Sequence, residues 1–558
     1  MTTSQFSKSA ATLFSLLVLL SAIAAAQLQI GSGNTAFADP NVPRPKTTPC
    51  VVTLYQHFEF ADFNPKSFTY TPPAACPGPW AKVILQANFS INEGRQFDRT
   101  ANIWIGPTNI YFGTTAEPSH NVSRHWHVER DLTDYSSIFT VTQTGTVDLG
   151  NLVNSTYTSI LHGSADILFF PLEQNQLPPR TADQVIAFSS GPTGGTVGLN
   201  TTTDLLEQTL TLPTNITDLY FDVFAQSQSN DEFWYSCVPN DVAGELQSCG
   251  GTAFRESEVT IDGTPAGVAP VYPWIYTGGI DPYLWRPIPG VQTMNFLPYR
   301  VNLTPFAALL DDGQVHTIAL SVFNADSYFS ATASLLLYLD SSATKLSGAV
   351  TENTLSVPVP DVIENIHTAS NGNIAGTVNT KSAHNFQISG YVNTSLGPVT
   401  TTVAQNIDFS NDQYFKVTPS FYEQDINQGT TIHSVVTTHN ASGSFTNIVN
   451  QTWPLKLNIT LLFNPDGSGS QATTVNQYYE RDQEDRHNGQ AISFSLIQNR
   501  VTPTDTLDFA PGFVITGNTN QSSAQNYFSS NSSGYCYSRD ITASAGLLTS
   551  VTNGQGCN

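Results

Sequence analysis

The sequence predicts an all-β protein built from sandwiches of short strands. Along most of the chain apolar and polar residues alternate with a period of two, as in residues 80–87, 219–225 and 317–323, which indicates half-buried strands. Glycines and prolines, 38 and 33 in number, mark turns at intervals of about 8–15 residues. Long helical periodicity is scarce, and we expect one short helical turn at residues 304–310. This combination favours β-sandwiches or jelly rolls.

The chain is too long for one hydrophobic core. Its 558 residues imply roughly two to four domains, and we place the boundaries at proline-rich breaks. Residues 49–172 and 173–342 are each predicted to form a β-sandwich, and residues 343–558 an additional C-terminal β domain that becomes rich in loops from Asn518 onward. Residues 27–48 contain three prolines and are expected to be a linker or extended arm.

The first 26 residues have the composition of a secretory signal peptide. Lys8 supplies a positive charge, residues 13–23 form an apolar run, and three alanines at 24–26 allow cleavage before Gln27. The run is short for a membrane span, with an uncleaved anchor as the alternative. We therefore expect a soluble protein that is secreted or held in the lumen of the secretory or vacuolar system, with no membrane partner after cleavage.

The cysteines and the glycosylation sequons agree with that location. Six cysteines fit the disulfides of an oxidising compartment, and the simplest pairing joins Cys50 to Cys76, Cys237 to Cys249 and Cys536 to Cys557. Sequence alone leaves other connectivities open. Twelve Asn-x-Ser/Thr sequons are expected on the surface as glycan acceptors: Asn88, Asn121, Asn154, Asn200, Asn215, Asn302, Asn393, Asn440, Asn450, Asn458, Asn520 and Asn531.

Charge and motifs exclude several classes of function. The balance of 21 Lys and Arg against 44 Asp and Glu gives a net charge of −23, which repels nucleic acid, so we expect no nucleic-acid partner. The chain shows no nucleophile elbow, Walker loop, Rossmann glycine pattern or His-Glu-x-x-His motif. His125 and His127 share one face of an expected strand, as a metal pair would. The simpler interpretation is a polar face beside a buried Trp126, and we expect no metal and no organic cofactor.

Two stretches carry the candidate catalytic acids. Asp98 and Arg99 stand at the entry to an expected strand at residues 101–105, where a carboxylate is held rigidly and still faces a cleft. Glu232 precedes three aromatic residues at 233–235, and a carboxylate packed against aromatic rings tends to have a raised pKa and to act as an acid. The structural alternatives are an ion pair of Asp98 with Arg95 or Arg99, and a solvated loop position for Glu232.

These stretches belong to long motifs in which the chain resembles the A-type peptide N-glycosidases, the peptide-N4-(N-acetyl-β-glucosaminyl)asparagine amidases of plants and fungi. The resemblance is strong over roughly residues 45–345 and weaker to about residue 480. Besides Cys50 and Cys76, it rests on YTPP at 70–73, GRQFDR at 94–99, TAEP at 115–118, LGNL at 149–152, TYT at 156–158, NDEFWYS at 230–236, FRE at 254–256, TGGIDP at 277–282 and LWRP at 284–287.

The bacterial F-type enzyme resembles this family distantly. Its first catalytic carboxylate lies in a Trp-Asp-Arg-Tyr-Ala-Asn segment, which is similar to residues 97–102 here. Its second lies in a Glu-Trp-Cys-Phe-Arg segment, which resembles Glu232 and Trp234 together with residues 254–255 beyond a disulfide loop. The resemblance therefore implies two jelly rolls side by side, with Asp98 and Glu232 as the catalytic pair between them.

A third functional acid of that relative would fall near residues 150–151, where this chain has glycine and asparagine. Glu117 and Glu256 are the candidates for its role. The resemblance further implies that Arg99 keeps Asp98 ionised, which lowers the pKa of Asp98. The remaining substrate-binding candidates are two arginines that could stabilise the oxyanion or grip the sugar and two tryptophans that could stack on it: Arg255, Arg286, Trp234 and Trp285.

The activity implied by the resemblance is hydrolysis of the β-amide bond between N-acetylglucosamine and asparagine in N-glycosylated peptides and proteins. It would release the glycan as a glycosylamine and convert asparagine to aspartate. Two other functions remain open. A glycoside hydrolase would use the same two acids on a bond within the glycan core, and a non-catalytic secreted carbohydrate-binding protein would need the aromatic residues but not both acids.

Overall fold

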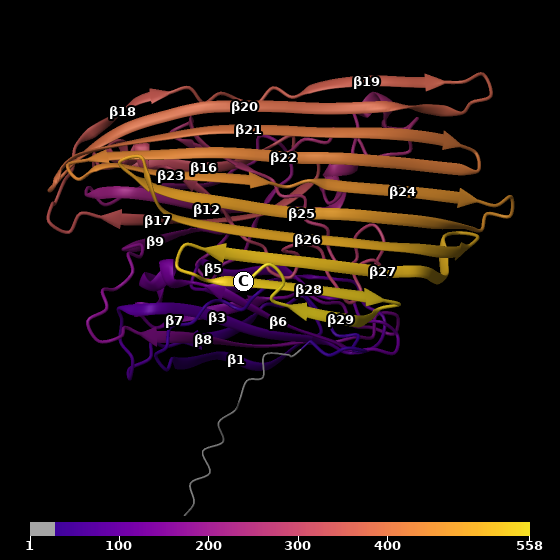
Figure 1. Cartoon of the computed structure of the whole chain (residues 1–558), viewed down its shortest axis with the longest axis horizontal. Helices are drawn as coiled ribbons and strands as arrows, with labels where there is room; N and C mark the ends of the chain where they lie inside the picture. Colours follow the sequence, from indigo (N-terminus) through magenta and orange to yellow (C-terminus); the bar gives the residue numbers. More distant parts are fainter. Residues whose placement is uncertain (1–27, 558) are drawn as a thin grey trace, which may run out of the picture.

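The computed structural model describes residues 28–557, and the signal peptide expected at residues 1–26 lies outside this range. The protein is all-β, as predicted, and its helical segments are short turns (Figure 1). Those within the first two sandwiches are η1 (Thr133–Thr140), η2 (Ser229–Asp231), η3 (Trp234–Ser236), α1 (Asn240–Ala243), η4 (Thr304–Phe306) and α2 (Ala307–Leu310). The last two form the helical turn expected at residues 304–310. No helix within residues 28–557 is long and apolar enough to cross a membrane.

The first sandwich consists of two four-stranded antiparallel sheets. One has the order β1 (Cys50–Phe60), β8 (Leu161–Pro171), β3 (Trp80–Ile91) and β6 (Arg124–Asp131). The other has the order β2 (Lys66–Tyr70), β7 (Gln143–Asp148), β4 (Thr100–Ile105) and β5 (Thr108–Thr114). First and last strands pair within one sheet, and the second and second-last within the other, which is the strand order of a jelly roll.

The second sandwich repeats this strand order. One sheet runs β10 (Val197–Leu199), β17 (Tyr328–Leu339), β12 (Ile216–Gln228) and β15 (Tyr299–Asn302), with β9 (Gln184–Phe188) also paired to β17. The facing sheet runs β11 (Leu206–Thr211), β16 (Val315–Phe323), β13 (Glu256–Ile261) and β14 (Thr264–Pro270). The chain therefore contains two consecutive jelly rolls, as predicted.

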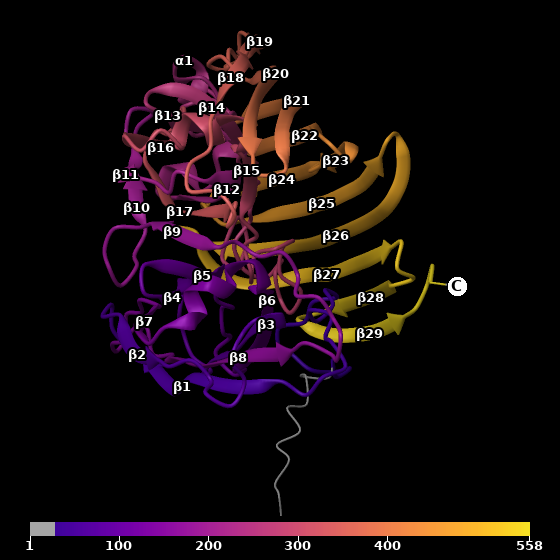
Figure 2. The same ribbon diagram turned by 90° about the vertical axis from the view of Figure 1, so that its left-hand side faces the viewer.

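The rest of the chain forms one 12-stranded antiparallel sheet that lies along one side of the jelly rolls (Figure 2). Its strands are β18 (Gly348–Asn353), β19 (Asp361–Thr368), β20 (Ile374–Thr394), β21 (Gly397–Thr418), β22 (Phe421–Asn440), β23 (Gly443–Thr452), β24 (Leu455–Phe463), β25 (Gly469–His487), β26 (Gln490–Ala510), β27 (Val514–Asn531), β28 (Cys536–Ser544) and β29 (Leu547–Asn553).

The expectation that the chain becomes rich in loops from Asn518 onward is wrong. Strands β27, β28 and β29 occupy most of that stretch. Its many serines, threonines and asparagines do not signal loops, because alternate side chains, such as Gln521, Ser523 and Gln525, are buried on one face of the sheet. Because the residues on both faces of these strands are mostly polar, the alternation of buried and exposed positions is not visible as an alternation of apolar and polar residues.

The large sheet shares a hydrophobic core with the second jelly roll. Phe409 of β21 lies 5.2 Å from Phe254 and 6.2 Å from Trp234, measured between ring centroids. Trp453 lies 5.4 Å from Tyr272 in the same way. The division into separate domains at 342/343 stays a prediction, and burial of apolar surface couples the two parts across it.

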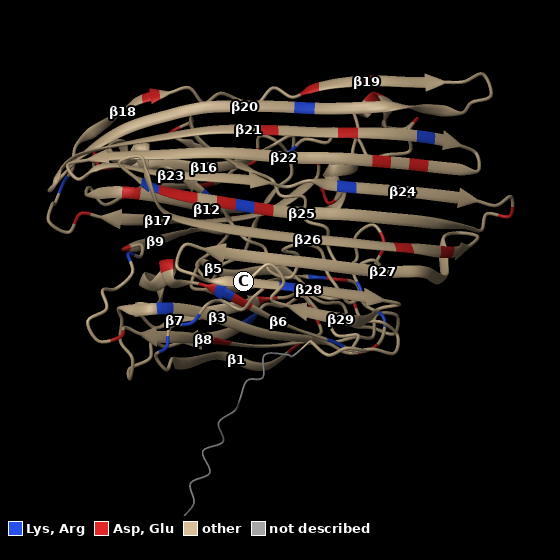
Figure 3. Ribbon diagram, viewed as in Figure 1, with Lys and Arg blue, Asp and Glu red and all other residues tan. Residues whose placement is uncertain are grey.

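The inner face of the large sheet is buried but carries almost no charge. Figure 3 shows charged residues widely spaced on its strands, with one dense run on β25. The polar side chains buried there are mainly hydroxyls and amides, and the amides include those of Asn411, Gln413, Gln424, Gln477 and Gln521. Buried amides need hydrogen-bond partners, and several of these find them on the loops of the second jelly roll.

Residues 28–48 form an extended arm without helix or strand, but this arm is held firmly. Ala36 and Ala38 are buried. The carboxylate of Asp39 accepts hydrogen bonds from the side-chain amides of Asn499 at 3.0 Å and Gln525 at 2.9 Å. The arm therefore docks on β26 and β27 and does not act as a free linker.

The three expected disulfides are present, joining Cys50 to Cys76, Cys237 to Cys249 and Cys536 to Cys557. All twelve sequon asparagines have exposed or half-buried side chains, as a glycan acceptor requires.

Candidate active site

Three carboxylates converge where the two jelly rolls meet. Asp98 lies two residues before β4, and Glu117 lies three residues after the end of β5. Glu232 comes from the second jelly roll, between η2 and η3. Asp98 interacts electrostatically with both Glu117 and Glu232. The structure therefore brings together the acids that the sequence predicted to meet, and it adds Glu117.

Gly278 fills the space between two of these acids. A Cβ atom at position 278 would lie 2.5 Å from Oδ1 of Asp98 and 2.6 Å from Oε1 of Glu117. No side chain fits at such distances, so glycine is required for both carboxylates to face this point. The backbone amide of Gly278 also hydrogen-bonds Asp98. Sequence reasoning noted the motif at residues 277–282 without assigning Gly278 a role.

Hydrogen bonds hold the segments that carry these residues. The amide of Thr115 donates to the carbonyl of Arg99 at 2.9 Å, and the amide of Arg99 donates to the Thr115 hydroxyl at 2.9 Å. The Thr277 hydroxyl donates to the Thr115 carbonyl at 2.7 Å. Since Thr277 belongs to the second jelly roll, Thr115 ties the Asp98 and Glu117 segments to the Gly278 loop.

Asp98 does not have the lowered pKa that its neighbour Arg99 suggested. Burial raises the pKa of Asp98 to about 6, against the opposing effects of the Gly278 amide and Arg99. The Arg99 guanidinium instead donates to the side-chain carbonyl of Gln96 at 2.9 Å. Desolvation of the carboxylate at the junction therefore outweighs the nearby positive charge.

Glu232 has the raised pKa that the sequence predicted. Burial, with a smaller contribution from the charge of Asp98, raises the pKa of Glu232 to about 7. Two buried tyrosines, Tyr235 and Tyr276, lie close enough to interact electrostatically with Glu232. Among residues 28–557 no lysine or arginine forms an ion pair with it.

Glu117 holds its proton most strongly of the three. Burial and the charge of Asp98 raise its pKa to about 8, although Arg286 opposes this. Arg286 donates to Oε2 of Glu117 at 3.3 Å and to the Pro118 carbonyl at 3.0 Å, and its guanidinium lies 4.7 Å from the ring centroid of Tyr283. Of the two candidates for a third functional acid, Glu117 therefore fits better than Glu256.

The two tryptophans predicted to stack on sugar lie in the core. Trp234 is 1% exposed and packs against Phe409, and Trp285 is 3% exposed. The indole nitrogen of Trp285 donates to the Gly279 carbonyl at 2.9 Å, so this residue supports the Gly278 loop from behind. The prediction of a stacking platform at these positions is wrong, because their large side chains fill space between jelly roll and large sheet.

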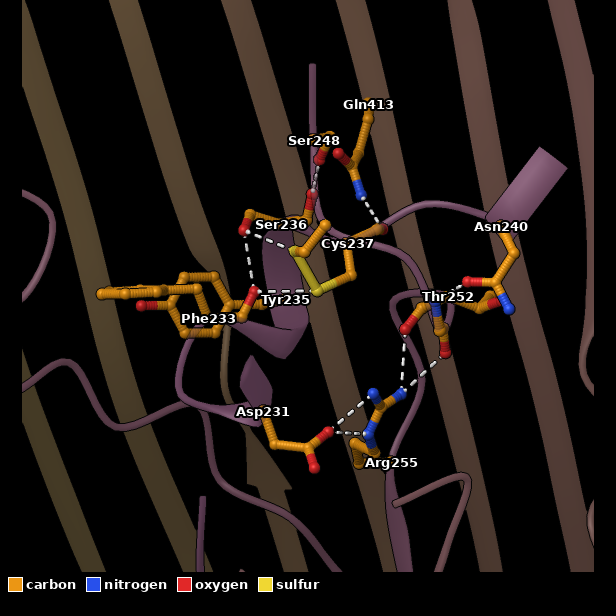
Figure 4. The surroundings of a disulfide bond; sticks show 12 residues. Asp231, Phe233, Tyr235, Ser236, Cys237, Asn240, Ser248, Thr252, Arg255 and Gln413 are labelled. Carbon is orange, nitrogen blue, oxygen red and sulfur yellow. Dashed lines mark hydrogen bonds and ion pairs between the residues drawn. A yellow bond between two sulfur atoms is a disulfide. The ribbon is translucent and has the colours of Figure 1, made fainter. Parts of the chain in front are cut away.

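Arg255 and Glu256 are also buried, and both form contacts inside the protein. Figure 4 shows Arg255 in an ion pair with Asp231, near the disulfide between Cys237 and Cys249. Glu256 is buried and contacts Nδ1 of His384 at 2.7 Å. Neither side chain joins the Asp98 cluster, so their prediction as substrate contacts is wrong.

Near Asp98 the side chains accessible to a substrate are not the predicted tryptophans and Arg255, but Phe97 and its neighbour Tyr157. Phe97 is 46% exposed, and its ring centroid lies 5.4 Å from that of Tyr157. Sequence reasoning included both residues in motifs but gave them no role. The predicted polar interpretation of the histidine pair is supported, because Trp126 is buried and His127 contacts Asn88 and Glu129.

Together, fold and site define a protein of two jelly rolls with a cluster of three acids of raised pKa at their junction. A family model described as peptide N-acetyl-beta-D-glucosaminyl asparaginase amidase A matches residues 39–356, more than half of the chain. The chain belongs to this family.

A relative along nearly the full length agrees with this assignment. The chain is 28% identical over 536 residues to peptide-N4-(N-acetyl-beta-glucosaminyl)asparagine amidase A of Prunus dulcis, covering 92% of this chain and 91% of that protein.

Similarity to solved structures is much lower. A structure of PNGF-II has 10% identity and a TM-score of 0.36, covering 52% of this chain and 66% of that one. PNGase F, a glycosylasparaginase from Flavobacterium meningosepticum, has 12% identity and a TM-score of 0.32, covering 52% and 96%. The jelly-roll assignment rests on the strand order of this chain alone.

Proposed function

We propose that this protein is an amidase that hydrolyses the β-amide bond between N-acetylglucosamine and asparagine in N-glycosylated peptides or proteins. The observation that carries the proposal is the convergence of Asp98, Glu117 and Glu232 in a chain that belongs to an amidase family. Its products are a peptide with aspartate in place of asparagine and a glycan released as a glycosylamine, which then loses ammonia.

The three acids divide the work by how firmly they hold protons. Asp98 ionises first and takes a proton from the attacking water, whose oxygen forms the new bond to the amide carbon. Glu232 stays protonated to higher pH and gives its proton to the departing nitrogen as the carbon–nitrogen bond breaks. Glu117, held beside Arg286, keeps its proton longest and donates a hydrogen bond to the substrate. Both protons are accounted for without a cofactor.

The rest of the proposal concerns where the enzyme works. The expected signal peptide, three disulfides and twelve sequons suit a protein that is secreted or held in a secretory or vacuolar lumen. N-glycosylated proteins are abundant there. The exposed ring of Phe97, next to Asp98, gives a sugar an apolar surface at the edge of the site.

One experiment separates this function from its alternatives. A purified N-glycopeptide is incubated with the enzyme in water enriched in oxygen-18, and the peptide is analysed by mass spectrometry. The amidase converts asparagine to aspartate with one oxygen-18 atom. A glycoside hydrolase leaves a sugar on the asparagine, and a carbohydrate-binding protein leaves the peptide unchanged. Either of these last results would overturn the proposal, with the Asp98→Asn variant as control.

A further inference from the structure

The loop that carries Gly278 and Arg286 rests on the large C-terminal sheet. It connects β14 to β15 and spans residues 271–298. The Gln521 side chain of β27 donates to the Arg286 carbonyl at 2.7 Å. The Gln471 side chain of β25 donates to the Ile280 carbonyl at 3.3 Å. The sheet therefore touches the loop within two residues of Gly278 and at Arg286 itself.

Between these contacts two aspartates meet in the interior. Asp281 of the loop is 0% exposed and Asp505 of β26 is 1% exposed. Oδ1 of Asp281 accepts from the Tyr283 amide at 2.9 Å, and Oδ1 of Asp505 accepts from the Asn518 side chain at 3.0 Å. The two carboxyl groups lie within reach of each other and interact. Within the described residues, the buried Oδ2 atom of each has no hydrogen-bond donor as a partner.

Two buried carboxyl groups that face each other are much more stable with one shared proton than with two negative charges. The charged groups that face the pair are few. Arg286 interacts with Asp281, and Asp508 interacts with Asp505. The neighbouring contacts from Gln471, Gln521 and Asn518 are amides, which do not titrate. The aspartate pair is therefore the part of this attachment that responds to pH.

We propose that Asp281 and Asp505 are positioning residues, which hold the Gly278 loop on the C-terminal sheet through one shared proton and release it when that proton is lost. The loop in turn sets the place of Asp98, Glu117 and Arg286. The effect on catalysis rests on the proposed function, whereas the attachment itself does not. The C-terminal sheet thereby takes part in the active site without contributing a catalytic residue.

The direction of the pH dependence follows from linkage. Burial raises the pKa of both aspartates above the ordinary value, and the charge of Asp505 adds to this effect at Asp281, as that of Asp508 does at Asp505. The folded protein therefore binds this proton more tightly than the unfolded chain does. The attachment is intact at acidic pH, weakens as pH rises above the ordinary aspartate pKa, and is lost above the raised pKa.

Hydrogen exchange of the whole protein tests the attachment directly. The amides of Leu284 and Arg286 donate to carbonyls within the loop, so their exchange reports how often the loop opens. After correction for intrinsic exchange, we expect protection to fall by up to about tenfold per pH unit between the ordinary aspartate pKa and the raised pKa, and to level off above the raised pKa. In Asp281→Asn the amide donates to Asp505 at every pH, and protection should vary by less than about twofold over the same range. The Asp505→Asn variant should behave alike.

A matched control is Asp540→Asn on β28, a carboxylate of the same sheet that accepts from Asn526. It should keep the wild-type pH dependence. If wild-type protection does not change between pH 5 and pH 9 (about the range in which the raised pKa lies), the shared proton is refuted. A pH dependence that persists in both Asp281→Asn and Asp505→Asn would overturn the proposal as well.

Activity provides the second readout. At pH about 6, Asp505→Ala should lower kcat/KM by roughly 10- to 100-fold through misplacement of the loop, and Asp505→Asn should restore most of it. Equal losses in both variants would contradict a positioning role. If the protein proved to lack amidase activity, the exchange experiment would still decide whether the aspartate pair holds the loop.

Discussion

Asp231 and Glu232 are neighbours in the sequence but have opposite surroundings. Oδ1 of Asp231 accepts from Nε and Nη2 of Arg255 at 2.9 and 2.7 Å. Its Oδ2 accepts from the amides of residues 326–328. Glu232 is half-buried, has a raised pKa and lacks an ion pair within residues 28–557. A carboxylate whose charge is fully compensated serves the fold, whereas one that is desolvated without compensation is available for proton transfer.

The same contrast separates the three clustered acids from the other buried acids. Asp222 is satisfied by Arg300 and by the Tyr135 hydroxyl, and it helps to join the two jelly rolls. The charge of Asp98 instead repels those of Glu117 and Glu232. Folding holds them together because the surrounding segments are fixed by backbone hydrogen bonds and a buried core. Such stored repulsion is characteristic of functional sites.

The largest expected effect tests the catalytic side of this comparison. Asp98→Asn and Glu232→Gln are nearly isosteric changes that remove proton transfer, so each should lower kcat by roughly 10²- to 10⁴-fold with little change in unfolding free energy. Kinetics on a glycopeptide together with denaturant unfolding would measure both. Asp466→Asn, a surface turn variant, is the control. Near-normal activity of Asp98→Asn would assign Asp98 to the structural class.

The structural side of the comparison predicts a loss of stability. Asp231→Ala leaves the buried guanidinium of Arg255 and three backbone amides without their acceptor. We expect a decrease in unfolding free energy of about 3–5 kcal/mol, measured by urea denaturation. A decrease below about 1 kcal/mol, the value typical of an exposed pair, would show that water replaces the carboxylate easily.

Gly278 is a structural residue on which the catalytic acids depend, because the absence of a side chain lets Asp98 and Glu117 approach the same point. Gly278→Ala places a methyl group against both Asp98 and Glu117 and should lower kcat/KM by roughly 10- to 100-fold through displacement of the loop. The matched control is Gly244→Ala just after α1, where the backbone is helical and a Cβ meets nothing within 4 Å. Full activity of Gly278→Ala would mean that the carboxylates can separate without consequence.

Sequence reasoning predicted the fold well because strand periodicity is a local property. The β-sandwiches, the helical turn at 304–310 and the disulfides were predicted from alternation, turn residues and cysteine spacing, and the family resemblance implied the two jelly rolls. It also identified Asp98 and Glu232, from motifs. It failed where the outcome depends on tertiary packing. The aromatic residues Trp234 and Trp285 looked like a binding surface but fill the core, and the segment beyond Asn518 looked like loops but forms strands.

The pKa of Asp98 shows why electrostatics could not be predicted from neighbours in sequence. Arg99 is adjacent along the chain, and its charge lowers the pKa, yet the guanidinium donates to Gln96 and burial dominates. Burial depends on the second jelly roll, whose Gly278 loop is about 180 residues away along the chain. No local pattern records that contact.

The smallest expected effect is on the pH profile, and it tests the order in which the acids ionise. Burial raises the pKa of Asp98 to about 6 and that of Glu232 to about 7. Below pH 6 Asp98 gains a proton and no base remains; above pH 7 Glu232 loses its proton and no acid remains. Glu117, with a pKa of about 8, keeps its proton through this window. The kcat/KM for a glycopeptide should therefore form a bell with its maximum between about pH 6 and pH 7, and each limb should fall about tenfold per pH unit.

Measurement between pH 3 and pH 9 (about three units on either side of the bell), with and without EDTA, would test this order. EDTA should have no effect, because the proposed mechanism uses no metal ion. In Glu117→Gln the acidic limb should stay in place, because Glu117 is protonated where Asp98 titrates and carries no charge that could repel it. An acidic limb well below pH 5 in the wild type would mean that Arg99 and the Gly278 amide outweigh burial, restoring the order predicted from sequence. If loop release contributes to the alkaline limb, that limb should shift in Asp281→Asn while the acidic limb stays unchanged. Such a shift would distinguish loop release from the titration of Glu232 as the cause of the alkaline limb.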